Sequence, residues 1–261
     1  MIARGANVQR PVGSETYGCC AREGRPDGRC PRETDFGVRK WLSSQDVAKR
    51  AGRTPMCRDH HRRSYHRAVQ LVLASRSPRR ASLLRDAGYD IEVQPADVDE
   101  CRRDDETARA HVARLAAEKA SVVAARHPGR VVIGADTVVV VDGIVLGKPV
   151  DRTDAARMLE LLAGRTHTVL TGVAVTRDEI LLEAVEATNV TLAALDPSRI
   201  AWYLNTGESD DKAGSYAAQG VGSRFIERIN GSYTNVVGLP IALVDRFVRQ
   251  FGANSLGLAV R

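Results

Sequence analysis

One stretch of the sequence decides the fold class: Val131-Val132-Ile133-Gly134-Ala135-Asp136-Thr137-Val138-Val139-Val140-Val141. So many β-branched residues in one run predict a strongly apolar strand over residues 130–141. The next two residues, Asp142-Gly143, are typical of a tight type I′ turn, so we expect a hairpin into residues 144–146. Gly134 and Ala135 lie inside the strand and leave room for a ligand or another backbone to approach.

Helices and further strands alternate on both sides of this stretch. The sequence predicts strands at residues 70–75, 91–93, 130–141, 144–146, 167–176 and 180–195, and a hairpin of residues 224–229 and 233–237 across Asn230-Gly231. It predicts helices that begin at Ser77-Pro78 and end at Gly88, span residues 106–126, run from a Thr153 cap to Leu162, run from Asp196-Pro197 to Asn205, and run from Pro240 to Phe251. Because helices join some strands and hairpins join others, we predict an α/β domain with a mixed sheet over residues 69–261.

Residues 1–68 differ in composition from the rest of the chain. They contain 15 Lys and Arg against 7 Asp and Glu, whereas the remaining residues contain 23 basic and 25 acidic side chains. Rich in Arg, Gly and Pro, they are predicted to be a basic, disordered extension with one short helix at residues 44–51. The charge permits nonspecific contact with nucleic acid through this extension, but a nucleic-acid role for the whole protein loses its support.

The cysteines and the apolar runs indicate in which cellular compartment the protein is expected. The chain has five cysteines, four of them in the first 68 residues, and it begins without an apolar leader, so we expect a cytoplasmic protein rather than a disulfide scaffold. No run approaches 18 apolar residues, which excludes a membrane helix. Zinc binding by the extension is an alternative, although the ligand spacing matches no standard finger. Its candidate ligands are Cys57, His60, His61 and His66, with Cys19, Cys20 or Cys30.

Two arginines stand where a helix begins. Arg79 and Arg80 follow Ser77-Pro78, in a first turn whose backbone N–H groups and dipole already favour an anion. Guanidinium groups suit phosphate, and the hydroxyls of Ser75 and Ser77 add further donors. We therefore predict an anion site here, the alternative being a solvated helix start.

Three more charged residues break or interrupt an apolar pattern. Asp136 inside its strand must meet a metal, a cation or a cleft, unless backbone N–H groups satisfy it. Lys119 falls on the apolar stripe of helix 106–126 and either extends to solvent or enters a polar cleft. Lys148 stands in a rigid turn between Gly147 and Pro149. Cations suit a polyphosphate, and a carboxylate suits a divalent metal or a general base, so the chemistry indicated is that of a phosphohydrolase.

Several other nucleotide and hydrolase motifs are absent from the sequence. It contains no Walker loop, no G-x-G-x-x-G and no G-x-S-x-G. A P-loop ATPase, a simple Rossmann dehydrogenase and an α/β-hydrolase serine enzyme are therefore disfavoured.

Five ordered motifs, covering about residues 70–252, resemble those of the Maf family. They are Leu73-Ala74-Ser75-Arg76-Ser77-Pro78-Arg79-Arg80, Gly134-Ala135-Asp136-Thr137, Leu146-Gly147-Lys148-Pro149, residues 211–220 (DKAGSYAAQG) and residues 230–240 (NGSYTNVVGLP). The resemblance implies a two-lobed α/β fold with a central cleft, similar to inosine triphosphate pyrophosphatases. It also implies hydrolysis of nucleoside triphosphates to a monophosphate and pyrophosphate with a divalent cation, Mg²⁺, Mn²⁺ or Co²⁺, and it makes a homodimer a reasonable expectation.

The resemblance also assigns roles to single residues. It makes Asp136 the proton acceptor for the attacking water or a metal ligand. Either residue of Asp99-Glu100, which stands where the family carries acidic residues, is a candidate second ligand, and we select Glu100. Ser75, Arg80, Lys119 and Lys148 match phosphate-cleft positions. The family has one branch that prefers dTTP and UTP and another that prefers 7-methyl-GTP. Three residues of this chain match the dTTP/UTP branch, namely Arg79, Thr137 and Gln219. We infer that the amide of Gln219 meets the pyrimidine base edge, since an amide both donates and accepts.

A different class of function is the alternative. In it the protein is a regulatory, nucleotide-sensing binder linked to septum formation, whose basic extension contacts nucleic acid or a division partner. Deleting residues 1–68 distinguishes the two, because an enzyme should keep its turnover and a binder should lose salt-dependent affinity.

Overall fold

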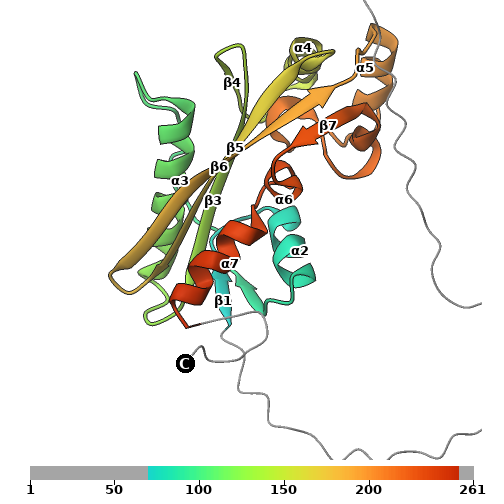
Figure 1. Ribbon diagram of the computed structural model, residues 1–261. Coiled ribbons are helices and arrows are strands. Elements are labelled where there is room, and N and C mark those ends of the chain that lie inside the picture. The colour runs from blue at the N-terminus through green and yellow to red at the C-terminus, as the bar shows by residue number, and fades with distance from the viewer. Residues whose placement is uncertain (1–69, 253–261) are drawn as a thin grey trace, which may run out of the picture. The chain divides into compact units, whose positions relative to one another are not determined.

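The computed structural model describes residues 70–252 (Figure 1). Within them seven strands form one mixed sheet, covered by helices. The strands are β1 (Leu71–Leu73), β2 (Ile91–Val93), β3 (Val132–Val141), β4 (Ile144–Leu146), β5 (Thr166–Arg177), β6 (Ile180–Leu192) and β7 (Ile226–Asn230). The helices are α2 (Pro78–Asp86), α3 (Ala108–Ala124), α4 (Arg152–Leu162), α5 (Pro197–Leu204), α6 (Tyr233–Val237) and α7 (Ile241–Gln250), with short 3₁₀ turns η1 (Ala213–Ser215) and η2 (Gly220–Phe225).

The sheet has the strand order β2-β1-β3-β5-β6-β7, and β4 pairs with β3 outside this path. β1 is parallel to β2 and β3, and these strands are connected through α2 and α3. The other neighbours, β3 with β5, β5 with β6 and β6 with β7, are antiparallel. The predicted mixed sheet in an α/β domain is therefore confirmed.

The central strand β3 has a gap along one edge. On that edge β1 pairs only with Val132 and Ile133, and β4 pairs only with residues 139–141. In the described part of the chain, residues 134–138 thus have no strand partner on this side. Such an edge presents backbone groups that side chains or a ligand must meet.

Two apolar cores lie on either side of this gap. One core combines Ile133 and Ala135 of β3 with residues of α2 and α7. The other combines Val139 and Val141 of β3 with residues of α4 and α5. The intervening segment of β3, at Asp136 to Val138, lies where the two cores meet, so the two-lobed architecture with a central cleft is confirmed.

Helix α3 rests directly on the backbone of the sheet. Figure 1 shows it along one face, opposite α7 and α2. A Cβ at Gly134 would lie 2.2 Å from the carbonyl oxygen of Ala116, and one at Gly172 would lie 2.1 Å from that of Val112. Any side chain at either strand position would hold the helix away. The two glycines therefore set how deeply the side chains of α3 reach over β3.

The largest error in the predicted elements concerns residues 233–237. They form helix α6 rather than a strand, and β7 pairs with β6 instead. Ser232 caps this helix, since its hydroxyl accepts from the N–H of Asn235 at 3.2 Å. The amide of Asn235 then donates to the carbonyl of Val169 at 3.1 Å. A run of five apolar and polar residues does not distinguish helix from strand, and here tertiary hydrogen bonds decide.

Smaller differences affect the ends of elements. Asp151, not Thr153, caps α4, and β6 ends at Leu192 rather than at residue 195. None of the helices within residues 70–252 is long and apolar enough to cross a membrane. The predicted disordered extension, its short helix at residues 44–51 and the candidate zinc ligands lie outside the described residues.

Candidate active site

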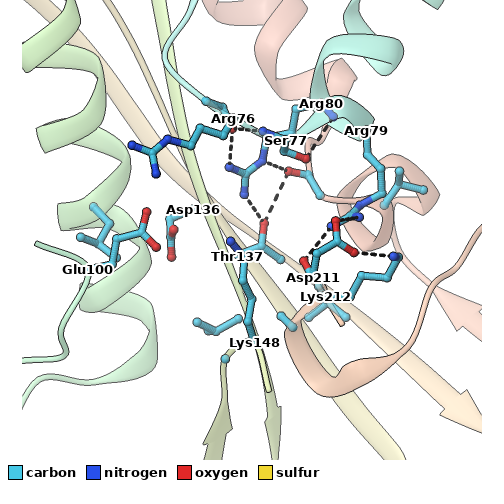
Figure 2. A pocket seen from close by; sticks show the side chains of 18 of the residues that line it. Arg76, Ser77, Arg79, Arg80, Glu100, Asp136, Thr137, Lys148, Asp211 and Lys212 are labelled. Carbon is cyan, nitrogen blue, oxygen red and sulfur yellow. Dashed lines mark hydrogen bonds and ion pairs between the residues drawn. The ribbon is translucent and has the colours of Figure 1, made fainter. Parts of the chain in front are cut away.

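A cleft of about 590 Å³ lies at the gap in the edge of β3 (Figure 2). It is lined by the loop after β1, the first turn of α2, α3, β3, the turn after β4, the segment before η2 and the end of α6. Every site residue predicted from the sequence lines this cleft. They are Ser75, Arg79, Arg80, Glu100, Lys119, Asp136, Thr137, Lys148 and Gln219.

Strand alternation sends two neighbouring side chains of β3 to opposite faces of the sheet. Asp136 points to the face that carries α3, where Lys119 Nζ donates to its Oδ1 at 2.7 Å. Thr137 points to the face that carries α2, where its hydroxyl accepts from Arg80 Nη2 at 2.9 Å. One strand thus contributes a carboxylate and a hydroxyl to two sides of the same cleft.

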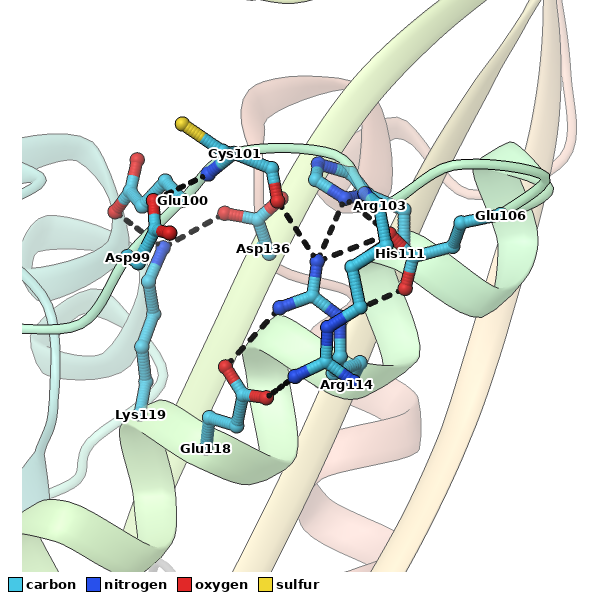
Figure 3. A network of polar contacts seen from close by, with 10 residues as sticks. All are labelled: Asp99, Glu100, Cys101, Arg103, Glu106, His111, Arg114, Glu118, Lys119 and Asp136. Carbon is cyan, nitrogen blue, oxygen red and sulfur yellow. Dashed lines mark hydrogen bonds and ion pairs between the residues drawn. The ribbon is translucent and has the colours of Figure 1, made fainter.

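Lys119 binds two carboxylates at once. Its ammonium lies 2.7 Å from Asp136 and 2.7 Å from Glu100 Oε1, and its side chain is only 8% exposed (Figure 3). The lysine therefore enters the cleft instead of extending to solvent. The buried carboxylate of Asp136 meets a cation, as its place in an apolar strand requires.

The neighbouring cations also act on Glu100. Burial by itself would raise the pKa of this carboxyl group. The hydrogen bond and charge of Lys119, with the charges of Lys148 and Arg80, outweigh burial and lower the pKa. Glu100 is therefore ionised at neutral pH and adds a second negative charge beside Asp136.

Arg80 is largely occupied by protein acceptors. Its Nε donates to the carbonyl of Gly238 at 2.8 Å, and its Nη1 donates to the carbonyl of Ala135 at 2.8 Å and to Ser75 Oγ at 3.2 Å. The Ala135 carbonyl belongs to the edge of β3 that no strand pairs. Burial lowers the pKa of Arg80, although the nearby Asp136 opposes this effect. Arg80 thus joins the start of α2 to β3 and to the turn after α6.

Thr137 holds the Arg80 guanidinium in this position. Its hydroxyl accepts from Arg80 and lies 3.0 Å from the hydroxyl of Thr171 on β5, which is fully buried. The side chain of Thr137 is therefore engaged within the protein.

Arg79 connects the two lobes. Its Nη1 donates to Asp211 Oδ2 at 2.8 Å, and its Nη2 donates to the carbonyl oxygen of Asp211 at 3.3 Å. Lys212 Nζ lies 2.5 Å from the other carboxylate oxygen of Asp211. Burial alone would raise the pKa of Asp211, but Lys212 and Arg79 lower it. The pair of arginines predicted at the start of α2 is thus shared between protein partners and the cleft.

Tyr216 also lines the cleft, and its hydroxyl lies 2.7 Å from His167 Nε2 in the protein interior. Burial lowers the pKa of His167 to about 4, so this imidazole is neutral near pH 7. Gln219 lines the cleft as well, is exposed, and makes no capping hydrogen bond to η2.

The oxygen ligands present suit a hard divalent cation. Mg²⁺ binds through one or two carboxylates together with substrate phosphates and water. Asp136 and Glu100, both bound to the same ammonium, supply such a pair. Within residues 70–252 no group of three or more His, Cys, Asp or Glu side chains could hold a metal by itself. The pair that could share a cation with substrate phosphates is therefore Asp136 and Glu100.

The sequence analysis missed several residues of the cleft. Arg76, Asp211 and Lys212 line it, although all three lie inside the motifs that were recognised. His111 on α3 also lines it, next to a half-buried ion pair of Glu106 and Arg114. Charged residues inside the recognised motifs could have indicated the first three. No spacing rule links Glu106 to Arg114, because Glu106 precedes the helix.

A family model described as Maf-like protein matches residues 70–251. The chain belongs to the Maf-like family. Two relatives, both named dTTP/UTP pyrophosphatase, are similar to this Maf-like chain over most of their own length. The relative from Koribacter versatilis is 48% identical over 188 residues, which cover 72% of this chain and 97% of the relative. The relative from Symbiobacterium thermophilum is 50% identical over 183 residues, which cover 70% and 94%.

A solved structure, that of the Staphylococcus aureus Ham1 protein, aligns with 70% of this Maf-like chain and 99% of its own length. Its sequence identity is 12% and its TM-score 0.38, a likeness too low to carry an argument. None of the comparisons supports the alternative of a regulatory binder.

Proposed function

We propose that this Maf-like protein hydrolyses nucleoside triphosphates, preferring dTTP and UTP, to the monophosphate and pyrophosphate. The observation that carries the proposal is the buried carboxylate of Asp136, held by Lys119 in a cleft lined with cations. Relatives 48% and 50% identical to this chain bear the name dTTP/UTP pyrophosphatase, which supports both the reaction and the substrates.

The cations of the cleft would bind the triphosphate. The cations that line it are Lys119, Lys148, Arg79 and Arg80, and the hydroxyl of Ser75 lies among them. Because Arg80 already donates to several protein acceptors, it contributes mainly a fixed positive charge and the position of Ser75. Cations placed around the phosphates stabilise the charge that the departing pyrophosphate carries away.

Asp136 would act on the attacking water. Lys119 holds one of its carboxylate oxygens, which leaves the other oxygen to accept a proton as the water attacks the α-phosphorus. The bond between the α-phosphorus and the bridging oxygen breaks, and pyrophosphate leaves with the bonding electrons. When bound, a divalent cation, Mg²⁺, Mn²⁺ or Co²⁺, would neutralise phosphate charge, and Asp136 and Glu100 are the residues that would hold it.

The choice of base is proposed to depend on Gln219. Its exposed amide lines the cleft and can both donate to and accept from the pyrimidine edge. Arg79 and Thr137 accompany it as residues of the dTTP/UTP branch. Their contacts in this protein, to Asp211 and to Arg80, suggest that they affect substrate choice by shaping the cleft.

Turnover by an Asp136→Asn variant of the full chain tests the proposal. Pyrophosphate release from dTTP, UTP, CTP and 7-methyl-GTP is measured with Mg²⁺ and with Mn²⁺. We expect release from dTTP and UTP by the wild type, and a loss of about 100-fold or more in kcat with nucleotide affinity largely kept by the variant. The matched control, Asp90→Asn, changes an exposed carboxylate outside the cleft and should leave kcat unchanged. Wild-type turnover by Asp136→Asn would exclude Asp136 as the proton acceptor.

Domain limits and partners belong to the same proposal. We infer that residues 69–261 form the catalytic domain, that residues 1–68 are not needed for turnover, and that the protein acts in the cytoplasm as a homodimer. Deleting residues 1–68 tests the first two points. Unchanged turnover is expected, and loss of any salt-dependent nucleic-acid affinity would assign that contact to the extension.

A further inference from the structure

The segment that carries Glu100 has little structure of its own. Residues 94–107, between β2 and α3, form neither helix nor strand, and Asp105 within them adopts a positive φ of 58°. Glu100 exposes 56% of its side chain, and its ion pair in the cleft is to Lys119. A side chain on such a segment is held in place only if something fixes the backbone beside it.

Arg114 of α3 fixes that backbone. Its Nη2 donates to the carbonyl oxygen of Cys101 at 3.0 Å, and Cys101 directly follows Glu100 (Figure 3). Its Nε and Nη2 also bind the two carboxylate oxygens of Glu106 at 2.7 and 2.9 Å. The remaining Nη1 donates to Glu118 at 3.1 Å. One guanidinium therefore holds both the middle and the end of the segment.

Glu106 contacts the same segment, and we call Arg114 and Glu106 together the clamp. Its carboxylate accepts from the backbone N–H of Arg103 at 3.1 Å and lies 3.1 Å from His111 Nδ1. The hydrogen bonds from Arg114 hold the pKa of Glu106 well below its usual range, although burial opposes them. Glu106 in turn raises the pKa of Arg114. Both shifts favour the charged forms, so the pair is charged near neutral pH and the clamp does not loosen there.

We propose that Arg114, together with Glu106, is a positioning residue that fixes Glu100 beside Lys119 and Asp136. Helix α3 then holds the segment twice, through the Arg114 contact to the backbone of Cys101 and through the Lys119 contact to the carboxylate of Glu100. Arg114 does not line the cleft, and its connections to the cleft are this segment and His111, whose Nδ1 lies 3.3 Å from Arg114 Nη2. The inference rests on the proposed function in one respect only, the assignment of Glu100 to the reaction.

A lysine cannot reproduce the planar set of hydrogen-bond donors that the Arg114 guanidinium provides. An ammonium can meet one carboxylate oxygen, but it cannot bind both oxygens of Glu106 and the Cys101 carbonyl in a plane. Arg114→Lys keeps the buried positive charge that Glu106 needs and loses the clamp. Arg109→Lys is the matched control, because Arg109 lies on the same helix, is exposed, and donates only to the carbonyl of Val185 at 3.3 Å.

Hydrogen exchange on the full chain without nucleotide tests the clamp directly. We expect backbone amides of residues 96–105 to exchange about tenfold faster in Arg114→Lys, with α4 and α7 unchanged. Arg109→Lys should match the wild type. If Arg114→Lys does not fold, Glu106→Gln, which keeps the shape of the side chain and weakens the same hydrogen bonds, replaces it. Unchanged exchange of residues 96–105 in the folded variant would overturn the proposal, whether or not the protein has the proposed activity.

A double-mutant cycle on pyrophosphate release tests the link to Glu100. Arg114→Lys should lower kcat about tenfold with a smaller change in KM, as for residues that orient a reacting group. In the Glu100→Gln background the same substitution should cost less than about twofold, because its target is already gone. A second full tenfold loss in that background would show that Arg114 acts elsewhere and would overturn the proposal. Absence of any wild-type turnover would instead count against the proposed function, and the exchange result would still decide the clamp.

Discussion

Alanine at position 134 tests whether the contact between α3 and the sheet sets the position of Lys119. The new Cβ would lie 2.2 Å from the carbonyl oxygen of Ala116 and 2.7 Å from the nitrogen of Ala120, the two residues on either side of Lys119 along this face of the helix. Since an ordinary contact begins at 3.4 Å, the helix must retreat by about 1.2 Å. A shift of that size would lengthen the present 2.7 Å between Lys119 Nζ and Asp136 Oδ1 beyond hydrogen-bonding distance.

Two quantities should fall together. Overpacking of this kind lowers the free energy of unfolding by about 1–3 kcal/mol, so Tm falls by several degrees. The displaced ammonium should lower kcat/KM for dTTP about 10- to 100-fold. Thermal unfolding and pyrophosphate release measure both. Gly147→Ala is the control for Tm, because a Cβ there meets nothing within 4 Å.

The pattern of results separates the steps of the reasoning. Wild-type Tm and turnover in Gly134→Ala would mean that α3 does not rest on Gly134. A lower Tm with unchanged kcat/KM would mean that the depth of α3 does not place Lys119 for the reaction.

Two further predictions concern Gln219 in the cleft and the buried His167. Gln219→Glu replaces a group that donates and accepts by one that only accepts, and kcat/KM for dTTP and UTP should fall about tenfold or more; equal values for both substrates in variant and wild type would remove Gln219 from the base site. Burial holds the pKa of His167 at about 4, against 6.5 when unfolded, so the unfolded chain takes up this proton first. The contribution of neutral His167 to the free energy of unfolding is then fully present above about pH 6.5. It falls by about 3 kcal/mol as the pH is lowered towards 4. Urea midpoints at about pH 7.5 and pH 5 should differ less in His167→Gln than in the wild type, and an equal decline in both would contradict the assignment.

Much of the fold and the cleft could be predicted because the deciding signals are local. The apolar run around Asp136 and the turn at Asp142-Gly143 each depend on a few adjacent residues, and both are found in the structure. Asp136 and Lys119 were identifiable because each breaks an apolar pattern, and burial of a charge demands a partner.

The rest depends on residues far apart in the sequence. Helix α6 was missed because Asn235 is fixed by Val169 and Thr188, 66 and 47 residues away. The acceptors of Arg80 were equally invisible, since Gly238 lies 158 residues along the chain. Such hydrogen bonds leave no periodicity in the sequence, and only the packed structure reveals them.

The unbroken pairing of β3 with β5 limits how this protein can move. The two strands pair without interruption from Val132 opposite Thr176 to Val140 opposite Thr168, and so pass through both lobes and behind the cleft. A hinge between the lobes would have to break this ladder, unlike the hinges of enzymes whose domains are joined by a few loop residues. Admission of a nucleotide and release of pyrophosphate therefore do not rely on rotation of one lobe against the other, and the strands behind the cleft keep its floor in place.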